Sequence, residues 1–177
     1  MKIVVITGSP HRHGTSALLA DEFIRGAEEA GHSVTSFDAA FMKIGACLGC
    51  DKCMMSGPCC QKDDMEQIIN AILQTDMIVF ATPLYYYGMS TQLKAVIDRF
   101  YSKNEQIQSK HMDSVLLSTC WNSDMPSMRG LKLHYEILVE YLNLNDKGAI
   151  YGLGCRTVPM MKYTDYPQQA HKLGRSL

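Results

Sequence analysis

The feature that most constrains the fold is a repeated alternation of strand-like segments with segments of helical periodicity. The strand-like segments are residues 2–6, 33–38, 77–81, 115–119 and 149–153. Helical segments are predicted at residues 17–30, 65–73, 90–101, 127–142 and 167–177. Such an alternation predicts a parallel sheet with helices on both faces. We therefore expect one α/β domain over residues 1–177, with a five-stranded, doubly wound sheet.

Individual segments support this expectation. Residues 77–81 are apolar without interruption, which is typical of a central strand covered on both faces. Residues 65–73 instead carry apolar side chains at i, i+3, i+4, i+7 and i+8, which gives one apolar helix face, and Asp63 and Asp64 precede them as caps. Gly31 is expected to end the first helix, and Pro167 to begin the last.

Composition excludes several classes of partner. The chain of 177 residues has a formal net charge of −1, so it has no basic surface suited to nucleic acid or anionic membranes. No apolar stretch reaches the length of a membrane span, and the N-terminal run is too short for a signal peptide. We expect a soluble, cytoplasmic protein that binds neither nucleic acid nor membrane.

The loop at residues 8–16 joins the first strand to the first helix and is expected to bind an anion. Its sequence, Gly-Ser-Pro-His-Arg-His-Gly-Thr-Ser, matches neither the dinucleotide nor the Walker glycine pattern. A helix N-terminus offers free N–H groups and partial positive charge, with Thr15 or Ser16 as the expected cap. The residues predicted to hold one phosphate monoester are Ser9, His11, Arg12, Gly14, Thr15 and Ser16. The alternative is an ordinary, well-capped strand-to-helix turn.

Two further loops are expected at the same sheet edge. After the third strand come Pro83, Leu84, Tyr85, Tyr86, Tyr87 and Gly88, and after the fourth come Thr119 and Trp121, the only tryptophan. Three consecutive tyrosines cannot all enter a core, so part of their ring surface is expected to face a ligand or a partner. Ligands of doubly wound sheets bind at the carboxyl ends of the strands. Together the three loops suit a flat aromatic mononucleotide, for which flavin mononucleotide (FMN) is the candidate.

These motifs resemble the NADPH-dependent FMN reductase family of the flavodoxin-like fold. The resemblance rests on Gly8-Ser9-Pro10 with Gly14-Thr15-Ser16, on residues 82–89, and on Gln92-Leu93-Lys94-Ala95 with Asp98-Arg99. It covers nearly the whole chain and implies a flavodoxin-like sandwich, non-covalent FMN and a homodimer or homotetramer. Members often carry Arg after Gly-Ser-Pro, where this chain has His11, so Arg12 is the nearer fixed charge.

Five of the seven cysteines lie in a loop expected at about residues 39–62, and this segment resembles the iron–sulfur flavoprotein branch of the family. Cys47, Cys50 and Cys53 have the spacing C-x2-C-x2-C, and Cys59 follows, with Cys60 as the other choice of fourth ligand. Cys47, Cys50, Cys53 and Cys59 are therefore candidate ligands of a [4Fe–4S] cluster. A four-cysteine zinc site and a metal-free loop beside the flavin are the alternatives. Cys120 and Cys155 are expected to be buried, and His134 to pack on the inner face of its helix.

The function expected from these features is an FMN-dependent NAD(P)H oxidoreductase that passes electrons to a quinone, flavin, azo or nitro acceptor. No catalytic side chain is expected, since the chemistry takes place at N5 of the flavin and NAD(P)H binds transiently. One alternative is an electron carrier with FMN and a [4Fe–4S] cluster that serves a redox protein partner. Another is a flavin-occupied protein-binding module that uses the three tyrosines.

Overall fold

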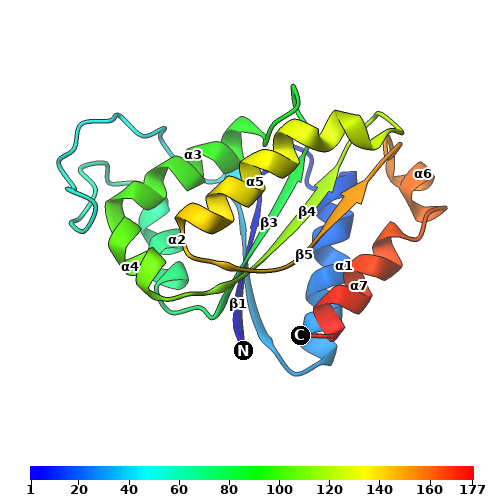
Figure 1. Cartoon of the computed structure of the whole chain (residues 1–177), viewed down its shortest axis with the longest axis horizontal. Helices are drawn as coiled ribbons and strands as arrows, with labels where there is room; N and C mark the ends of the chain where they lie inside the picture. The colour runs from blue at the N-terminus through cyan, green and yellow to red at the C-terminus, as the bar shows by residue number, and fades with distance from the viewer.

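Five parallel strands form one sheet in the computed structural model, which describes all 177 residues (Figure 1). The strands are β1 (Lys2–Thr7), β2 (Ser33–Asp38), β3 (Met77–Pro83), β4 (Asp113–Thr119) and β5 (Asn145–Gly152). Their order is β2-β1-β3-β4-β5, and every neighbouring pair is parallel. This arrangement confirms the predicted doubly wound, flavodoxin-like sheet. β3 lies at its centre and is buried along nearly its whole length, as its uninterrupted apolar run predicts.

Helices cover both faces of the sheet (Figure 1). One face carries α1 (Thr15–Glu29) and α7 (Tyr166–Arg175), which pack on alternate strand residues such as Val5 and Val79. The other carries α2 (Met65–Ile72), α3 (Thr91–Arg99) and α5 (Arg129–Tyr141), which pack on the intervening residues such as Ile6 and Phe80. The two apolar cores therefore follow from the two-residue period of the strands. None of the helices combines the length and apolar character needed to cross a membrane.

Several element boundaries differ from the prediction. The helix expected at 90–101 is α3 followed by the 3-10 turn η2 (Phe100–Lys103) and the short α4 (Asn104–Ser109). The 3-10 turns η1 (Ala39–Phe41) and η3 (Met125–Met128) and the five-residue α6 (Val158–Lys162) were not expected. β5 starts four residues earlier than predicted because its first residues are polar and pair with the start of β4.

The prediction that Thr15 or Ser16 caps α1 is wrong. Gly14 is the N-cap, and no side chain accepts a hydrogen bond there, because Thr15 and Ser16 already lie in the first helical turn. Gly31 does follow the end of α1 with φ +84°, and Pro167 does lie at the start of α7.

Strand order reverses between β1 and β3, since the chain first moves outward to β2 and then returns past β1. The carboxyl ends of the strands at such a switch point form a crevice where doubly wound proteins bind ligands. The loops that leave β1, β3, β4 and β5 meet at this edge, which is the upper edge in Figure 1.

Candidate functional site

A cavity of about 550 Å³ opens at the carboxyl edge of the sheet. This volume is within the range of small-molecule sites. Four loops line it, with Ser9, His11, His13, Gly14, Thr15 and Ser16 from the first, Pro83, Leu84 and Tyr85 from the second, Thr119, Cys120 and Trp121 from the third, and Cys155, Arg156, Thr157 and Val158 from the fourth. The lining includes no Asp or Glu, which suits an anionic ligand.

The uncapped N-terminus of α1 forms part of the cavity wall. The backbone N–H groups of Thr15 and Ser16 find no acceptor in the protein, because Gly14 offers no capping side chain. These groups and the hydroxyls beside them, at the positive end of the helix dipole, are of the kind that binds anions at helix N-termini. The arrangement fits a phosphate monoester.

The loop at residues 8–16, which is predicted to bind phosphate, is held in place by contacts with residues that follow β3 and end β4. The Thr15 hydroxyl lies 2.9 Å from the Thr119 hydroxyl at the end of β4, so it joins two walls of the cavity. Ser90 Oγ donates to the Gly8 carbonyl at 2.7 Å. A Cβ atom at Gly8 would lie 2.4 Å from that Ser90 Oγ and 2.6 Å from Leu93 Cβ, so only glycine fits this close approach.

The structure brings most of the predicted phosphate residues together but turns one aside. Ser9, His11, Gly14, Thr15 and Ser16 line the cavity, whereas Arg12 does not. The Arg12 guanidinium stacks over the ring of Phe41 at 3.7 Å and pairs with Asp38 at 3.4 Å. Its charge is therefore engaged outside the cavity.

The second loop divides its predicted residues between two surfaces. Pro83, Leu84 and Tyr85 line the cavity, but Tyr86, Tyr87 and Gly88 do not. Tyr85 and Gly88 exchange backbone hydrogen bonds of 3.1 and 3.0 Å across a two-residue turn. Tyr86 and Tyr87 occupy the turn with φ of 45° and 64°, a left-handed conformation that is costly for aromatic residues.

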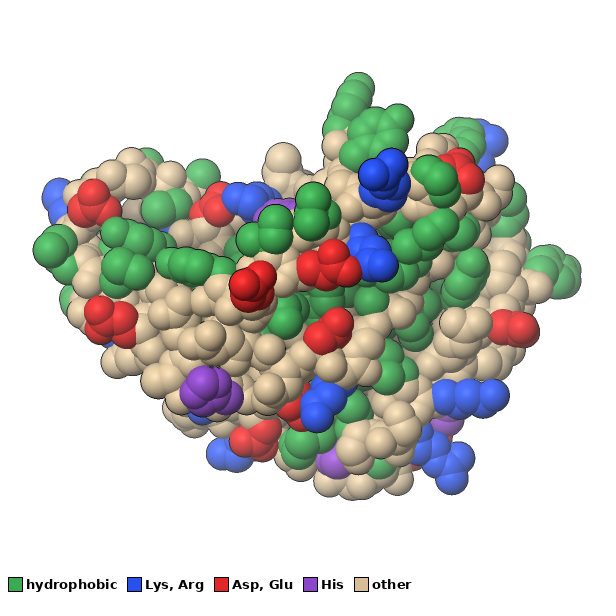
Figure 2. Space-filling model, viewed as in Figure 1, with side chains coloured by type: hydrophobic (Ala, Val, Ile, Leu, Met, Phe, Trp, Pro, Cys, Tyr) green, Lys and Arg blue, Asp and Glu red, His purple; other side chains and the backbone are tan.

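This tyrosine turn projects from the molecule. The Tyr86 side chain is fully exposed and the Tyr87 side chain is 63% exposed. Figure 2 shows hydrophobic side chains that rise above the upper edge, where Figure 1 draws the loop between β3 and α3. The left-handed turn thus places the rings of Tyr86 and Tyr87 in solvent, beside the cavity rather than in it.

The fourth loop is a wall of the cavity that sequence reasoning missed. It leaves β5, and its backbone is hydrogen-bonded to the loop after β4 by Cys155 N to Cys120 O and by Gly154 N to Asn122 O, both at 2.8 Å. Because strand ends at this edge of a parallel sheet share a crevice, the loop after the last strand could have been included on the same rule as the others.

Trp121 and Arg156 form the outer rim where the third and fourth loops meet. The Arg156 guanidinium lies 3.7 Å from the Trp121 ring centroid, and the Trp121 side chain is 64% exposed. Thr119 and Trp121, the two residues predicted from the third loop, thus both line the cavity.

Two buried thiols lie at the floor of the cavity. Cys120 and Cys155 are 6% and 3% exposed, as expected from the sequence. Burial raises the pKa of both, that of Cys155 to about 11, so these thiols are protonated at neutral pH. His134 is half-buried between α3 and α5, outside this cavity, and burial lowers its pKa.

The five remaining cysteines surround a second, much smaller cavity of about 20 Å³. Cys47, Cys50, Cys53, Cys59 and Cys60 all line it, together with Tyr101. Cys50 Sγ lies 3.5 Å from Cys60 Sγ, and no three of the chain's Cys, His, Asp or Glu side chains group closely enough to hold a single metal ion. Five thiols are the donor type that holds an iron–sulfur cluster, but the cavity between them has room for about one water molecule, so the loop as it stands does not enclose a [4Fe–4S] core.

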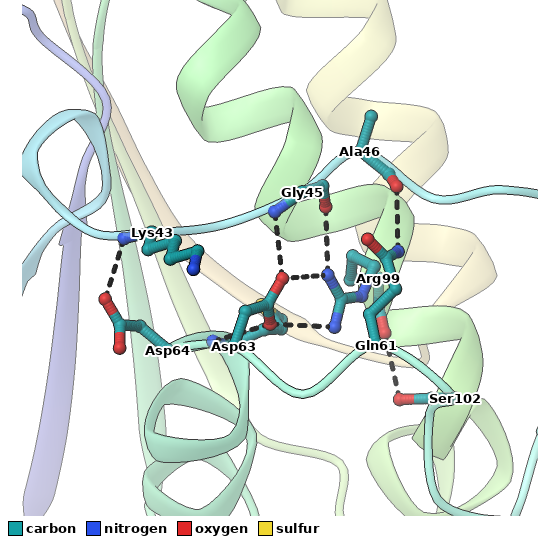
Figure 3. Close-up of polar contacts among 9 residues, drawn as sticks. Lys43, Gly45, Ala46, Gln61, Asp63, Asp64, Arg99 and Ser102 are labelled. Carbon is teal, nitrogen blue, oxygen red and sulfur yellow. Dashed lines mark hydrogen bonds and ion pairs between the residues drawn. The ribbon is translucent and has the colours of Figure 1, made fainter.

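The two ends of the cysteine segment are held together by polar contacts (Figure 3). Asp63 accepts from the backbone N–H of Gly45 at 2.9 Å, and Arg99 Nη1 donates to the Gly45 carbonyl at 2.9 Å. Asp64 accepts from Lys43 N at 2.7 Å, and Gln61 Nε2 donates to Ala46 O at 2.9 Å. Asp64 is the N-cap residue of α2 but makes no side-chain capping bond; Asp63 instead accepts from Met65 N at 3.2 Å.

Comparison with known proteins gives matches over most of the chain. A family model described as NADPH-dependent FMN reductase matches residues 1–120. An iron–sulfur flavoprotein of Archaeoglobus fulgidus is 31% identical over 119 residues, which cover 66% of this chain and 54% of that protein. A Bacillus subtilis protein, YwqN, whose name describes an NAD(P)H-dependent FMN-containing oxidoreductase, is 28% identical over 171 residues, 88% of this chain and 87% of that one.

Solved structures with the same fold include an NAD(P)H:quinone oxidoreductase of Methanothermobacter marburgensis. It superposes with a TM-score of 0.70 at 18% identity, over 99% of this chain and 95% of the other. At that identity the likeness establishes the fold alone. The match to the iron–sulfur flavoproteins spans about half of their length.

Proposed function

The chain belongs to the NADPH-dependent FMN reductase family, and from this premise we propose that its 177 residues form one FMN-binding domain with NAD(P)H oxidoreductase activity. The single observation that carries the proposal is the carboxylate-free cavity, which is lined both by an uncapped helix N-terminus and by aromatic side chains. A flavin mononucleotide has a phosphate at one end and a flat ring at the other. The cavity matches both.

Each part of the proposed ligand has residues suited to it. The free amides of Thr15 and Ser16, with the hydroxyl of Ser9, would hold the phosphate. Leu84 and Tyr85 would flank the ring, and the neighbouring backbone would meet its polar edge.

FMN, when bound, supplies two-electron chemistry between a nicotinamide and an acceptor. The protein's own part is to orient the ring and leave one side open to a second molecule. Tyr85 and Trp121 are 41% and 64% exposed, so an aromatic surface remains accessible at the rim. We propose a small, flat acceptor (a quinone, flavin, azo or nitro compound) for this surface.

The first experiment is a titration of the flavin-free protein with FMN, followed by the intrinsic fluorescence of the only tryptophan. FMN bound in the cavity that Trp121 lines is expected to quench that emission. The bound flavin should then be bleached by NADPH or NADH under anaerobic conditions and reoxidised by a quinone. Absence of quenching, or a flavin that neither nucleotide reduces, would refute the proposal.

A second candidate function, an electron carrier with FMN and a [4Fe–4S] cluster, is favoured by the five cysteines around one small cavity. Iron and acid-labile sulfide should be measured after anaerobic purification. About four of each per chain are expected if the cluster is present. Cys47→Ser should remove them, whereas the buried Cys155→Ser, outside the segment, should not. If the wild-type protein contains no iron and still turns over NAD(P)H, the electron-carrier function is refuted and the reductase function stands.

All seven cysteines are free, which suits a reducing compartment, and we propose a cytoplasmic location.

We also propose that the protein self-associates through α5. Leu133, Ile137 and Tyr141 form an exposed stripe at i, i+4 and i+8, with 53–58% of each side chain in solvent. Arg129 and Lys132 lie in the first half of this helix and Glu136 and Glu140 in the second. Antiparallel pairing with a second copy would place basic halves against acidic halves. Sedimentation should show a dimer that Ile137→Lys converts to a monomer.

A further inference from the structure

We propose that Arg156, on the loop after β5, is the side chain that binds the phosphate of the cofactor and selects FMN over riboflavin. This inference rests on the proposed function, since it assigns a role toward the proposed ligand. It concerns a residue that the flavin-loop motifs in the sequence do not include.

The charge distribution of the cavity singles out Arg156. Among the 16 lining residues it is the only Lys or Arg, and none is Asp or Glu. Arg156 is exposed at the rim and has no carboxylate partner within the cavity, so an anionic group of the ligand is the partner open to it there. The phosphate is the part of the proposed cofactor that carries negative charge.

The Arg156 side chain is also free to bind. The guanidinium makes no hydrogen bond and no ion pair anywhere in the structure; its one contact of note is the stack on Trp121. Stacking holds the guanidinium plane without using its N–H donors, which stay available for two hydrogen bonds to phosphate oxygens.

The backbone connects the loop of this arginine to the walls that hold the predicted anion site. Cys120 N donates to Gly152 O at 2.9 Å, and Cys155 N donates to Cys120 O at 2.8 Å, so the fourth loop follows the third. The third loop begins at Thr119, whose hydroxyl meets that of Thr15 on α1. α6, which starts two residues after Arg156, packs against α1. The loop of Arg156 is therefore joined, through the third loop, to the cavity wall that contains Thr15.

The rival cation is Arg12, which lies within the phosphate-type loop itself. It is stacked on Phe41 and paired with Asp38, and it is not part of the lining. The two arginines thus have similar aromatic supports but differ in whether a carboxylate already engages them. This difference makes them a matched pair for a test.

The test measures dissociation constants of FMN and of riboflavin, which lacks the phosphate, by flavin fluorescence. Arg156→Gln is expected to weaken FMN binding roughly 10- to 100-fold and to change riboflavin binding by less than about 3-fold. Arg156→Lys should give an intermediate loss, since it keeps the charge but not the planar pair of donors. Arg175→Gln, which removes an exposed charge from the end of α7 at the opposite edge of the sheet, is the control for net charge.

Riboflavin binding reports whether each variant retains a folded pocket, so a loss confined to FMN supports the inference. A loss confined to Arg12→Gln would overturn it. An unchanged ratio of the FMN and riboflavin dissociation constants in Arg156→Gln would also overturn it. If that variant instead raised KM for NADPH but not for NADH, the arginine would be assigned to the phosphate of the nucleotide, which overturns the inference as well. If the wild type binds FMN and the ratio does not move, only this inference fails; if it binds neither flavin, the proposed function fails as well.

Discussion

Arg99 and Asp63 form a buried ion pair in which Arg99 Nη1 and Nη2 donate to the two carboxylate oxygens at 2.9 and 3.0 Å. Their side chains are 3% and 9% exposed. The pair joins the C-terminal end of α3 to the point where the cysteine segment enters α2, and through Gly45 it also reaches the other end of that segment. One arginine therefore closes a loop of 17 residues that contains five thiols, residues 46–62.

Removal of this arginine is expected to be costly. Arg99→Ala leaves the Asp63 carboxylate buried without its partner, so we expect a loss of about 3–5 kcal/mol in the free energy of unfolding. Urea denaturation measures it. Lys94→Ala, which breaks the exposed Lys94–Asp98 pair on the same helix, should cost no more than about 0.5 kcal/mol. Equal losses in the free energy of unfolding from the two variants would show that the buried pair stabilises the protein no more than an exposed pair does.

The same pair predicts how stability depends on pH. Hydrogen bonds from Arg99 hold the pKa of Asp63 below its ordinary value. A carboxyl whose pKa is lower in the folded state stabilises the protein above its unfolded pKa of about 3.9, and that contribution is lost as pH falls through the folded pKa. The stability advantage of wild type over Asp63→Asn should therefore be full at pH 6 and shrink below about pH 4. An advantage that stays constant down to pH 2.5 would contradict this account.

The sheet and its helices were predictable because the signals are local. An unbroken apolar run such as 77–81 and a one-sided helix such as α2 each reveal their burial within about ten residues. The first three walls of the cavity were predictable for a related reason, since the parallel topology brings successive strand ends to one edge.

What could not be predicted depends on contacts between distant segments. Arg99 has the sequence context of an exposed charge, and only the fold places Asp63 against it, 36 residues away. Arg12 is predicted to face the phosphate because it lies in the loop at residues 8–16. The structure instead places Asp38 and Phe41 beside it, which the sequence does not reveal. The tyrosine run was correctly expected to be partly exposed. Its division between Tyr85 in the cavity and Tyr86 in solvent, however, requires a left-handed turn that aromatic residues rarely adopt.

The left-handed conformation of Tyr86 therefore lowers the stability of the protein. Tyr86 has a fully exposed side chain and a φ of 45°, so Tyr86→Asn removes no burial and relieves the strain. We expect a gain of about 1 kcal/mol in the free energy of unfolding. Tyr163→Asn is the control, because that tyrosine is 94% exposed at a φ of −89°. A gain equal to that of the control would argue against strain at the turn.

The seven thiols are expected to fall into two reactivity classes. Cys155, with its pKa raised to about 11, has about one thiolate in a thousand at pH 8, and Cys120 is also buried with a raised pKa. After chelation of any metal under reducing conditions, a disulfide reagent at pH 8 should modify the five cysteines of residues 47–60 rapidly. The other two should react only in urea. Peptide mapping that finds Cys155 among the rapid sites would contradict the burial.

At the contact between α1 and α7 we expect a Gly→Ala substitution to destabilise the protein, although alanine has the higher helix propensity. Alanine is the better helix former by about 0.8–1 kcal/mol, so replacing a glycine by alanine in the middle of an exposed helix is stabilising. Here a Cβ atom at Gly174 would lie 2.2 Å from the carbonyl oxygen of Phe23, and a Cβ at Gly26 would lie 2.1 Å from that of His171. Both obstacles are backbone, which cannot move aside without separating the two helices. We expect Gly174→Ala to lower the free energy of unfolding by about 2 kcal/mol, whereas Lys172→Ala on the exposed face of α7 should change it by less than about 0.5 kcal/mol. A stabilised Gly174→Ala variant in urea denaturation would mean that the helices are not in backbone contact.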